Sequence, residues 1–131
     1  MISLRTIRTA HSGQTIVEFA LASLVFLTII FGTIDFGRAI FIRAELVNAA
    51  REGARYGKIN PTQTTAIRAA TVDHAPGSGL TSSSVSVSCT GRCATGNSLT
   101  VVASVPFQAV TQQLLGIGPL TLTGSATVNI E

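Results

Sequence analysis

A long uncharged apolar run near the N-terminus constrains the fold of this chain more than any other feature. No residue from Phe19 to Ile34 is charged, and Asp35 ends the run. Extended back over Glu18 to Gln14, the run has about the twenty residues that a helix needs to cross a bilayer. We therefore expect a membrane-spanning helix, with Glu18 near one end of it rather than at its centre.

The helical pattern continues beyond the apolar run. Apolar and small residues recur at helical spacing from Phe36 to Gly57. A second face carries charged residues at steps of seven, namely Arg38, Glu45 and Glu52. The pattern predicts one continuous helix over about residues 14–57, roughly 65 Å long at 1.5 Å per residue. Its first half is apolar on all sides, and its second half is amphipathic.

Two details of this helix concern its contacts. Ala49, Gly53 and Gly57 have a small-xxx-small spacing, which permits close approach of two backbones. The close contact would be made either with other helices or with the chain's own sheet. Asp35 and Arg38 lie three residues apart, which allows a local ion pair. We favour the interpretation that these two charges simply mark the outer membrane surface.

The rest of the chain is predicted to form a small α+β domain. Asn60 and Pro61 are typical of an N-cap and a first helical residue, before a short helix over about residues 62–74. Strands are expected at 85–89, 99–105 and 120–130, and apolar and polar residues alternate clearly in the last. Between the last two strands we expect one helical turn or an irregular crossing. The expected fold is α+β, with the long helix packed on a small antiparallel sheet and one short helix.

Cys89 and Cys93 are the only cysteines, in the sequence C-T-G-R-C within a Gly-, Ser- and Thr-rich stretch. A tight disulfide across a hairpin loop is favoured, and it would place the residues after about 40 in an oxidising compartment. A zinc site would need about four ligands, and only His11 and His74 supplement the cysteines, at irregular distances. Two reduced thiols without a role are the remaining alternative.

Composition and charge argue against several functions. Hydrophobic residues make up 46% of the chain and charged residues 11%, a balance typical of a membrane segment or a packed assembly. The net charge is +3, without a cluster of Lys and Arg among aromatic residues, so nucleic-acid binding is not expected. The acids show no paired spacing, and no Gly-rich phosphate loop follows a strand. We expect no enzyme activity, no small-molecule substrate, no cofactor and no metal.

The residues before the apolar run indicate its orientation. Arg5 and Arg8 precede it, so the positive-inside rule puts the N-terminus in the cytoplasm and the rest of the chain outside. A secretory signal would have a shorter apolar core followed by a small-residue cleavage site. No such site closes the run before Asp35, so an uncleaved anchor is favoured over an ordinary signal peptide.

Glu18 is the residue that a plain anchor does not explain. An ionised carboxylate inside a membrane costs on the order of 2.5–3.5 kcal/mol and usually has a partner. Arg5 and Arg8 are at least roughly 15 Å away along a straight helix. A cut between Gly13 and Gln14 would create an α-amino cation four residues before Glu18, in the same subunit or in a neighbour. Without a cut, Glu18 would lie at the headgroup level and need no partner.

This arrangement is similar to that of type IV pilin-like proteins. It has a short basic leader, Gly13 before the cut, Glu18 at the fifth mature position and then an apolar helix. More closely, the segment resembles the TadE family of pseudopilins. The Gly–Gln start, the V-E-F-A core and the A-A-R-E-G-A-R segment carry the resemblance, which covers about residues 13–57, a third of the chain.

The resemblance implies a function and a division of the chain. Residues 1–13 would be a leader, 14–57 the membrane and assembly helix, and 58–131 a small periplasmic α+β domain. A prepilin peptidase would cut after Gly13, and Glu18 would neutralise the new amine of Gln14. The protein would be a minor pseudopilin of a Tad (Flp) pilus, acting in pilus initiation, biogenesis or adherence. Its other partners would be further pilus subunits, the inner-membrane assembly platform and membrane lipid.

A second hypothesis retains the membrane anchor but excludes assembly of the protein into a pilus. The chain would then be a permanently anchored periplasmic protein that binds a partner through its small domain and never polymerises. Under both hypotheses the helix lies in a bacterial inner membrane with its N-terminus in the cytoplasm. The first hypothesis adds a place in a surface pilus.

Overall fold

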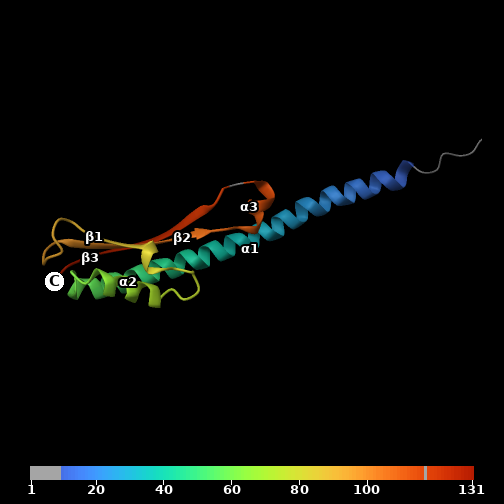
Figure 1. The fold of residues 1–131 in the computed structure, drawn as a ribbon. Coiled ribbons are helices and arrows are strands. Elements are labelled where there is room, and N and C mark those ends of the chain that lie inside the picture. Colours follow the sequence, from blue (N-terminus) through green and yellow to red (C-terminus); the bar gives the residue numbers. More distant parts are fainter. Residues whose placement is uncertain (1–9, 117) are drawn as a thin grey trace, which may run out of the picture.

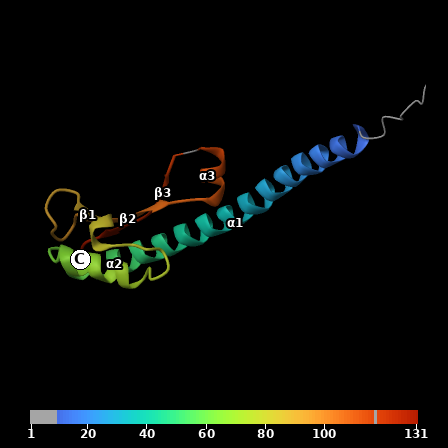
Figure 2. The ribbon, with the colours of Figure 1, turned by 45° about the vertical axis from the view of Figure 1, so that its right-hand side comes forward.

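One helix runs through the whole length of the molecule. The structure, a computed structural model, describes residues 10–116 and 118–131, and residues 1–9 with most of the expected leader lie outside the described part. Helix α1 (Ala10–Ile59) has 50 residues. The other elements pack along its C-terminal half, while its N-terminal half projects beyond them (Figures 1 and 2). The predicted continuous helix over residues 14–57 is therefore confirmed, with a few more residues at each end.

Two threonine hydroxyls within the apolar half of α1 are satisfied by the helix itself. Thr28 Oγ1 donates to the carbonyl oxygen of Leu24 at 2.8 Å, and Thr33 Oγ1 donates to that of Ile29 at 2.9 Å. Such bonds back to the preceding turn remove polar groups that a hydrocarbon environment would otherwise leave unpaired. The two threonines therefore do not oppose burial of this half in lipid.

The start of the second helix differs from the prediction. Helix α2 (Thr64–Asp73) has Gln63, not Asn60, at its N-cap position. The N–H of Asn60 still donates to Tyr56 of α1 at 3.1 Å, and the carbonyl of Asn60 accepts from the N–H of Gln63 at 3.2 Å. Asn60 and Pro61 therefore end α1 and form a turn, and the second helix begins only after that turn.

The sheet has three antiparallel strands in the order β1-β2-β3. They are β1 (Val85–Cys89), β2 (Ser98–Phe107) and β3 (Leu120–Asn129). The short 3-10 helix η1 (Ser82–Ser84) precedes β1, and helix α3 (Val110–Leu115) lies between β2 and β3. The α+β fold class is confirmed: α3 forms where one helical turn or an irregular crossing was expected, and η1 is an addition that the sequence did not predict.

The core lies between the C-terminal half of α1 and one face of the sheet. Alternate residues of β2 are buried, as expected for a strand with one face on the core. Fully buried side chains come from α1, α2 and β2: Leu46, Ala49, Ala50, Ala54, Ile67, Leu99, Val101 and Ala103. The opposite face carries Ser and Thr pairs such as Thr100 and Thr127, whose hydroxyls are 2.9 Å apart. The sheet thus covers α1 on one face and is polar on the other.

Small residues bring α1 close to the rest of the domain. A Cβ added at Gly53 would overlap Thr71 Oγ1 of α2, and one at Gly57 would lie 3.0 Å from Leu99 Cδ2 of β2. Ala49, on the same face, is fully buried. The small-xxx-small face that the sequence singles out therefore contacts the chain's own α2 and β2.

The backbones of β3 and α1 come very close together at Gly124. A Cβ added at Gly124 of β3 would lie 2.5 Å from the carbonyl carbon of Leu46 and 2.5 Å from the backbone nitrogen of Val47. Both of these atoms belong to the α1 backbone, which cannot move aside as a side chain can. Gly124 is thus the point that allows the sheet to lie directly on the helix.

We expect Gly124→Ala to destabilise the domain by about 1–3 kcal/mol or more, because overpacking against backbone forces the sheet away from α1. Thermal unfolding of the full chain in detergent, followed by circular dichroism, would measure the loss. Gly118→Ala is the matched control, since no heavy atom lies within 4 Å of a Cβ added there. Equal melting temperatures for the two variants would contradict the prediction.

Candidate functional site

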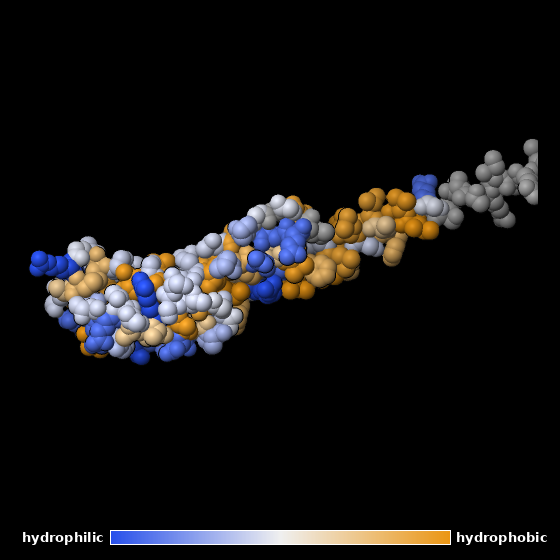
Figure 3. Space-filling model, viewed as in Figure 1, coloured by the Kyte–Doolittle hydropathy of each residue, from blue (hydrophilic) through white to orange (hydrophobic). Residues whose placement is uncertain are grey.

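The projecting half of α1 is the most unusual surface of the molecule. Its large apolar side chains are exposed on all sides, and Figure 3 shows the apolar surface that they form on one face. They include Ile16, Val17, Phe19, Leu21, Leu24, Val25, Phe26, Ile29 and Ile34. An apolar surface of this extent is typical of a membrane or protein contact. Within the described residues, α1 is the helix that is long and apolar enough to cross a membrane, which supports membrane anchoring or secretion.

The candidate processing residues lie at the start of this surface. Gly13, Gln14 and Glu18 are all within α1 and exposed. Gln14 and Glu18 are one helical turn apart, and with Gly13, Val17 and Leu21 they line one shallow side of the helix. No hydrogen bond or ion pair joins Glu18 to another described residue, and Arg5 and Arg8 lie outside the described part. The carboxylate thus sits one turn from the expected new N-terminus.

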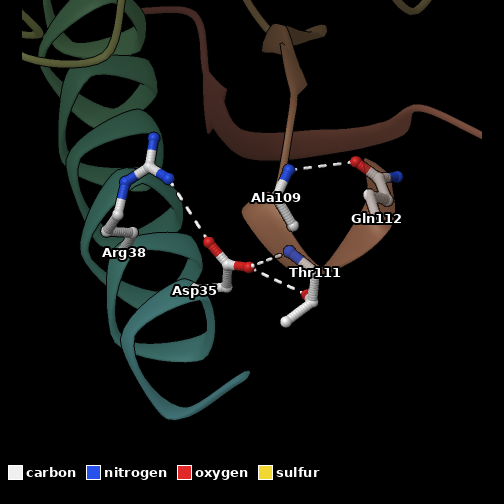
Figure 4. Close-up of polar contacts among 5 residues, drawn as sticks. All are labelled: Asp35, Arg38, Ala109, Thr111 and Gln112. Atoms are coloured by element: carbon white, nitrogen blue, oxygen red, sulfur yellow. Dashed lines mark hydrogen bonds and ion pairs between the residues drawn. The ribbon is translucent and has the colours of Figure 1, made fainter. Parts of the chain in front are cut away.

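Asp35 has a role that the sequence does not reveal. Its side chain is buried at the point where α1 leaves the domain, and its Oδ2 accepts two hydrogen bonds from Thr111 (Figure 4). The donors are the backbone N–H and the hydroxyl of Thr111, both at 2.8 Å. Arg38 Nη1 lies 3.4 Å from Asp35 Oδ1. The local ion pair that the three-residue spacing allows is therefore confirmed, and Asp35 in addition ties α1 to α3.

Helix α3 is a small unit held by its own polar contacts. Gln112 Oε1 accepts a hydrogen bond from the N–H of Ala109 at 3.0 Å, at the start of the helix (Figure 4). Gly116 ends the helix in the left-handed conformation, with φ of 66°, which glycine adopts without steric cost. Gln112 Nε2 also donates to the carbonyl of Gly118. Through Thr111 this unit is fixed at the level of Asp35.

The environment of Asp35 favours its charged form. The backbone N–H of Thr111 is the main cause that lowers the pKa of Asp35 below its ordinary value of 3.8. The N–H of Val110, the Thr111 hydroxyl and Arg38 act in the same direction, whereas loss of hydration raises the pKa. Because folding lowers the pKa, the contact stabilises the folded state above the ordinary pKa. This stabilisation is lost as the pH falls below about 4.

Cys89 is the last residue of β1, and Cys93 lies in the connection between β1 and β2. Cys89 and Cys93 are joined in a disulfide, with their Cα atoms 5.3 Å apart. Asn97 Nδ2 donates to the carbonyl of Arg92 at 2.8 Å and holds the same loop. Figure 1 places this connection at the end of the domain opposite the projecting helix. In the described part of the chain, no group of three or more His, Cys, Asp or Glu is arranged to hold a metal ion.

Comparison with known proteins gives one match. Residues 13–55 match the model of a family described as TadE-like protein. The matched residues are the projecting half of α1 and most of its packed half, about a third of the chain. The resemblance to TadE-like proteins is thus confirmed over this segment. No curated protein and no solved structure matches the chain.

We expect Asp35→Ala to lower the melting temperature of the full chain at pH 7 more than Thr111→Val does. The first change removes the acceptor of both hydrogen bonds, whereas the second keeps the backbone donor. The difference between wild type and Asp35→Ala should shrink as the pH falls below about 4, because the Asp35 carboxylate is then protonated first in the unfolded chain and, at still lower pH, in the folded one. Thermal unfolding in detergent at several pH values would measure both effects.

The matched control is Asp73→Ala, which removes an exposed carboxylate at the end of α2. It should change the melting temperature little at any of these pH values. An Asp35→Ala variant that is as stable as this control at pH 7 would contradict a structural role for the contact with Thr111.

Proposed function

We propose that this chain, whose N-terminal third matches the TadE-like proteins, is a minor pseudopilin of a Tad-type pilus. The match together with an apolar helix that projects beyond the domain carries the proposal. The protein would act in pilus initiation, biogenesis or adherence rather than as a catalyst. It would lie in a bacterial inner membrane, with its N-terminus in the cytoplasm and its domain in the periplasm.

Processing would divide the chain into three parts. A prepilin peptidase would remove residues 1–13 as a leader, residues 14–57 would serve as the membrane and assembly helix, and residues 58–131 would form the periplasmic domain. The exposed position of Gly13 and Gln14 on the outer part of α1 supports this division. The cut would place the α-amino group of Gln14 one helical turn from the Glu18 carboxylate. The two opposite charges would then neutralise each other in a medium where either alone is costly.

The shape of α1 supports a role in assembly. Its outer half is apolar on all sides, so it needs lipid or other helices around it in every state of the protein. If the subunit leaves the bilayer, neighbouring helices must replace the lipid. In such a bundle the amine of one subunit would pair with Glu18 of the next, which would fix the axial register between them. The partners would be other pilus subunits and the inner-membrane assembly platform.

Mass spectrometry of the protein from its native cell tests the cut directly. We expect a mature N-terminus at Gln14, unmodified, cyclised or methylated, in cells with an active prepilin peptidase. In cells that lack the peptidase, the leader should remain attached. An intact Met1 in the presence of the active peptidase would overturn the proposal.

Replacing Glu18 by Gln tests the role of its charge. The substitution keeps the shape of the side chain and removes its negative charge, so we expect the protein to be made and cut but pilus assembly and adherence to fall to the level of a deletion strain. Electron microscopy of surface pili and an adherence assay would measure this. Glu52→Gln, on the domain-packed half of the same helix, is the matched control and should assemble normally.

The alternative is a permanently anchored periplasmic interaction protein. It predicts that Glu18→Gln leaves pili and adherence unchanged, since an anchor with its acid at the headgroup level needs no partner for it. Normal assembly by the Glu18→Gln variant would therefore favour the alternative over the pseudopilin.

A further inference from the structure

We propose that the end of the domain formed by α3 and the start of β3 rests on the lipid surface of the membrane. The proposal depends on the membrane anchoring put forward above and adds a second lipid contact to it. The contact would be made by Val110 and Leu115 at the two ends of α3 and by Leu120, the first residue of β3. It would fix how close the domain sits to the bilayer while the subunit is anchored.

The level of α3 along α1 follows from the two hydrogen bonds between Thr111 and Asp35. The segment from Gln14 to Ile34 is roughly 30 Å long at 1.5 Å per residue, which matches the hydrocarbon thickness of a bilayer. Asp35 is the next residue and therefore lies where the headgroups begin. Thr111 of α3 donates two hydrogen bonds to Asp35, both at 2.8 Å. Helix α3 must therefore lie at the membrane–water interface.

The two ribbon views agree with this position. In both, α3 is the part of the domain nearest to the projecting half of α1 (Figures 1 and 2). A hollow lined by Phe31 of the apolar segment and by Val110, Thr111 and Gln113 of α3 joins the two surfaces. The apolar surface of the anchor thus meets α3 at this hollow, where Phe31 and Val110 are the apolar lining residues.

The side chains at this end are suited to lipid. Val110 is 53% exposed, Leu115 59% and Leu120 55%, although each has a large apolar side chain. Burying such side chains in the interfacial region is favourable in proportion to the apolar area removed from water. A contact with lipid would thus use apolar surface that the fold itself leaves uncovered.

The charge pattern removes the usual obstacle to such a contact. No residue from Cys93 to Ile130 is charged, so α3 and all of β3 approach the membrane without a charge to desolvate. The carboxylate of Asp35 is already buried and hydrogen-bonded. Arg38 lies one turn further along α1 with its side chain 51% exposed, and a cation at this level is attracted by anionic lipid headgroups.

Single tryptophans test the proposal, because the chain contains no Trp of its own. Full-length variants with Leu115→Trp, Phe26→Trp or Thr95→Trp would be reconstituted in phosphatidylcholine–phosphatidylglycerol vesicles whose acyl chains carry bromine, a contact quencher. Phe26 lies in the projecting half of α1, and Thr95 is exposed in the β1–β2 connection at the opposite end of the domain. We expect Phe26→Trp to be quenched by deep bromines and Leu115→Trp by shallow ones, with a blue shift, while Thr95→Trp stays unquenched.

The outcomes separate this inference from the proposed function. If Phe26→Trp is quenched and Leu115→Trp behaves like Thr95→Trp, the anchor stands and the α3 contact is overturned. If Phe26→Trp is not quenched either, the anchor itself fails. A Leu115→Trp signal that is shielded from acrylamide but not quenched by bromine would mean that another copy of the chain covers α3, which also overturns the proposal.

A further pair of variants controls for the affinity of Trp itself for interfaces. In a Leu120→Trp chain, we expect quenching by shallow bromines, and adding Leu115→Asp should reduce it, because a carboxylate next to the contact repels anionic lipid. Quenching that Leu115→Asp leaves unchanged would show that the introduced Trp drives the contact, and would overturn the proposal.

Discussion

A single continuous helix must be stable both in an apolar environment and against the domain in water, and the rest of the structure follows from this. The outer half of α1 exposes apolar side chains on all sides, whereas the inner half buries one face against α2 and the sheet. No element of the domain reaches past the level of α3 along α1 (Figure 1). The domain therefore leaves the outer half to lipid or to other helices and stabilises only the half that stands in water.

The junction between the two halves is controlled by a few polar contacts. Asp35 is the first charge after the apolar run, and the fold uses it to hold α3 rather than to face solvent. Arg38 then lies between Asp35 and the ring of Phe107, whose centroid is 5.4 Å from the guanidinium carbon. Together these contacts join α3 and the end of β2 to α1 at the level where the helix leaves the domain.

Local patterns predicted most of the fold, and contacts distant in sequence account for what they missed. The apolar run and the helical spacing that follows give α1, and alternation gives the three strands. Asn60 and Pro61 misled the prediction because the same two residues suit both a helix start and the turn that they form. The contact between Asp35 and Thr111 spans 76 residues, and no local rule pairs them. Likewise, Gly124 is visible as a glycine within a strand, but its contact with the α1 backbone appears only in three dimensions. The candidate processing site differs, because Gly13, Gln14 and Glu18 are close in sequence, and their spacing between a basic leader and an apolar run singles them out.

The exposed edge of the sheet at β3 affects how the protein behaves when it is overproduced. Strand β3 has ten residues, contains no charge and no proline, and pairs with β2 on one side only. Natural proteins commonly protect such an edge with charges, prolines or bulges, because its unpaired backbone groups accept a strand from another molecule. When a cell makes more of this protein than the membrane and the partner subunits can accommodate, we expect the surplus copies to aggregate by strand addition at β3. This aggregation would come in addition to association through the apolar helices.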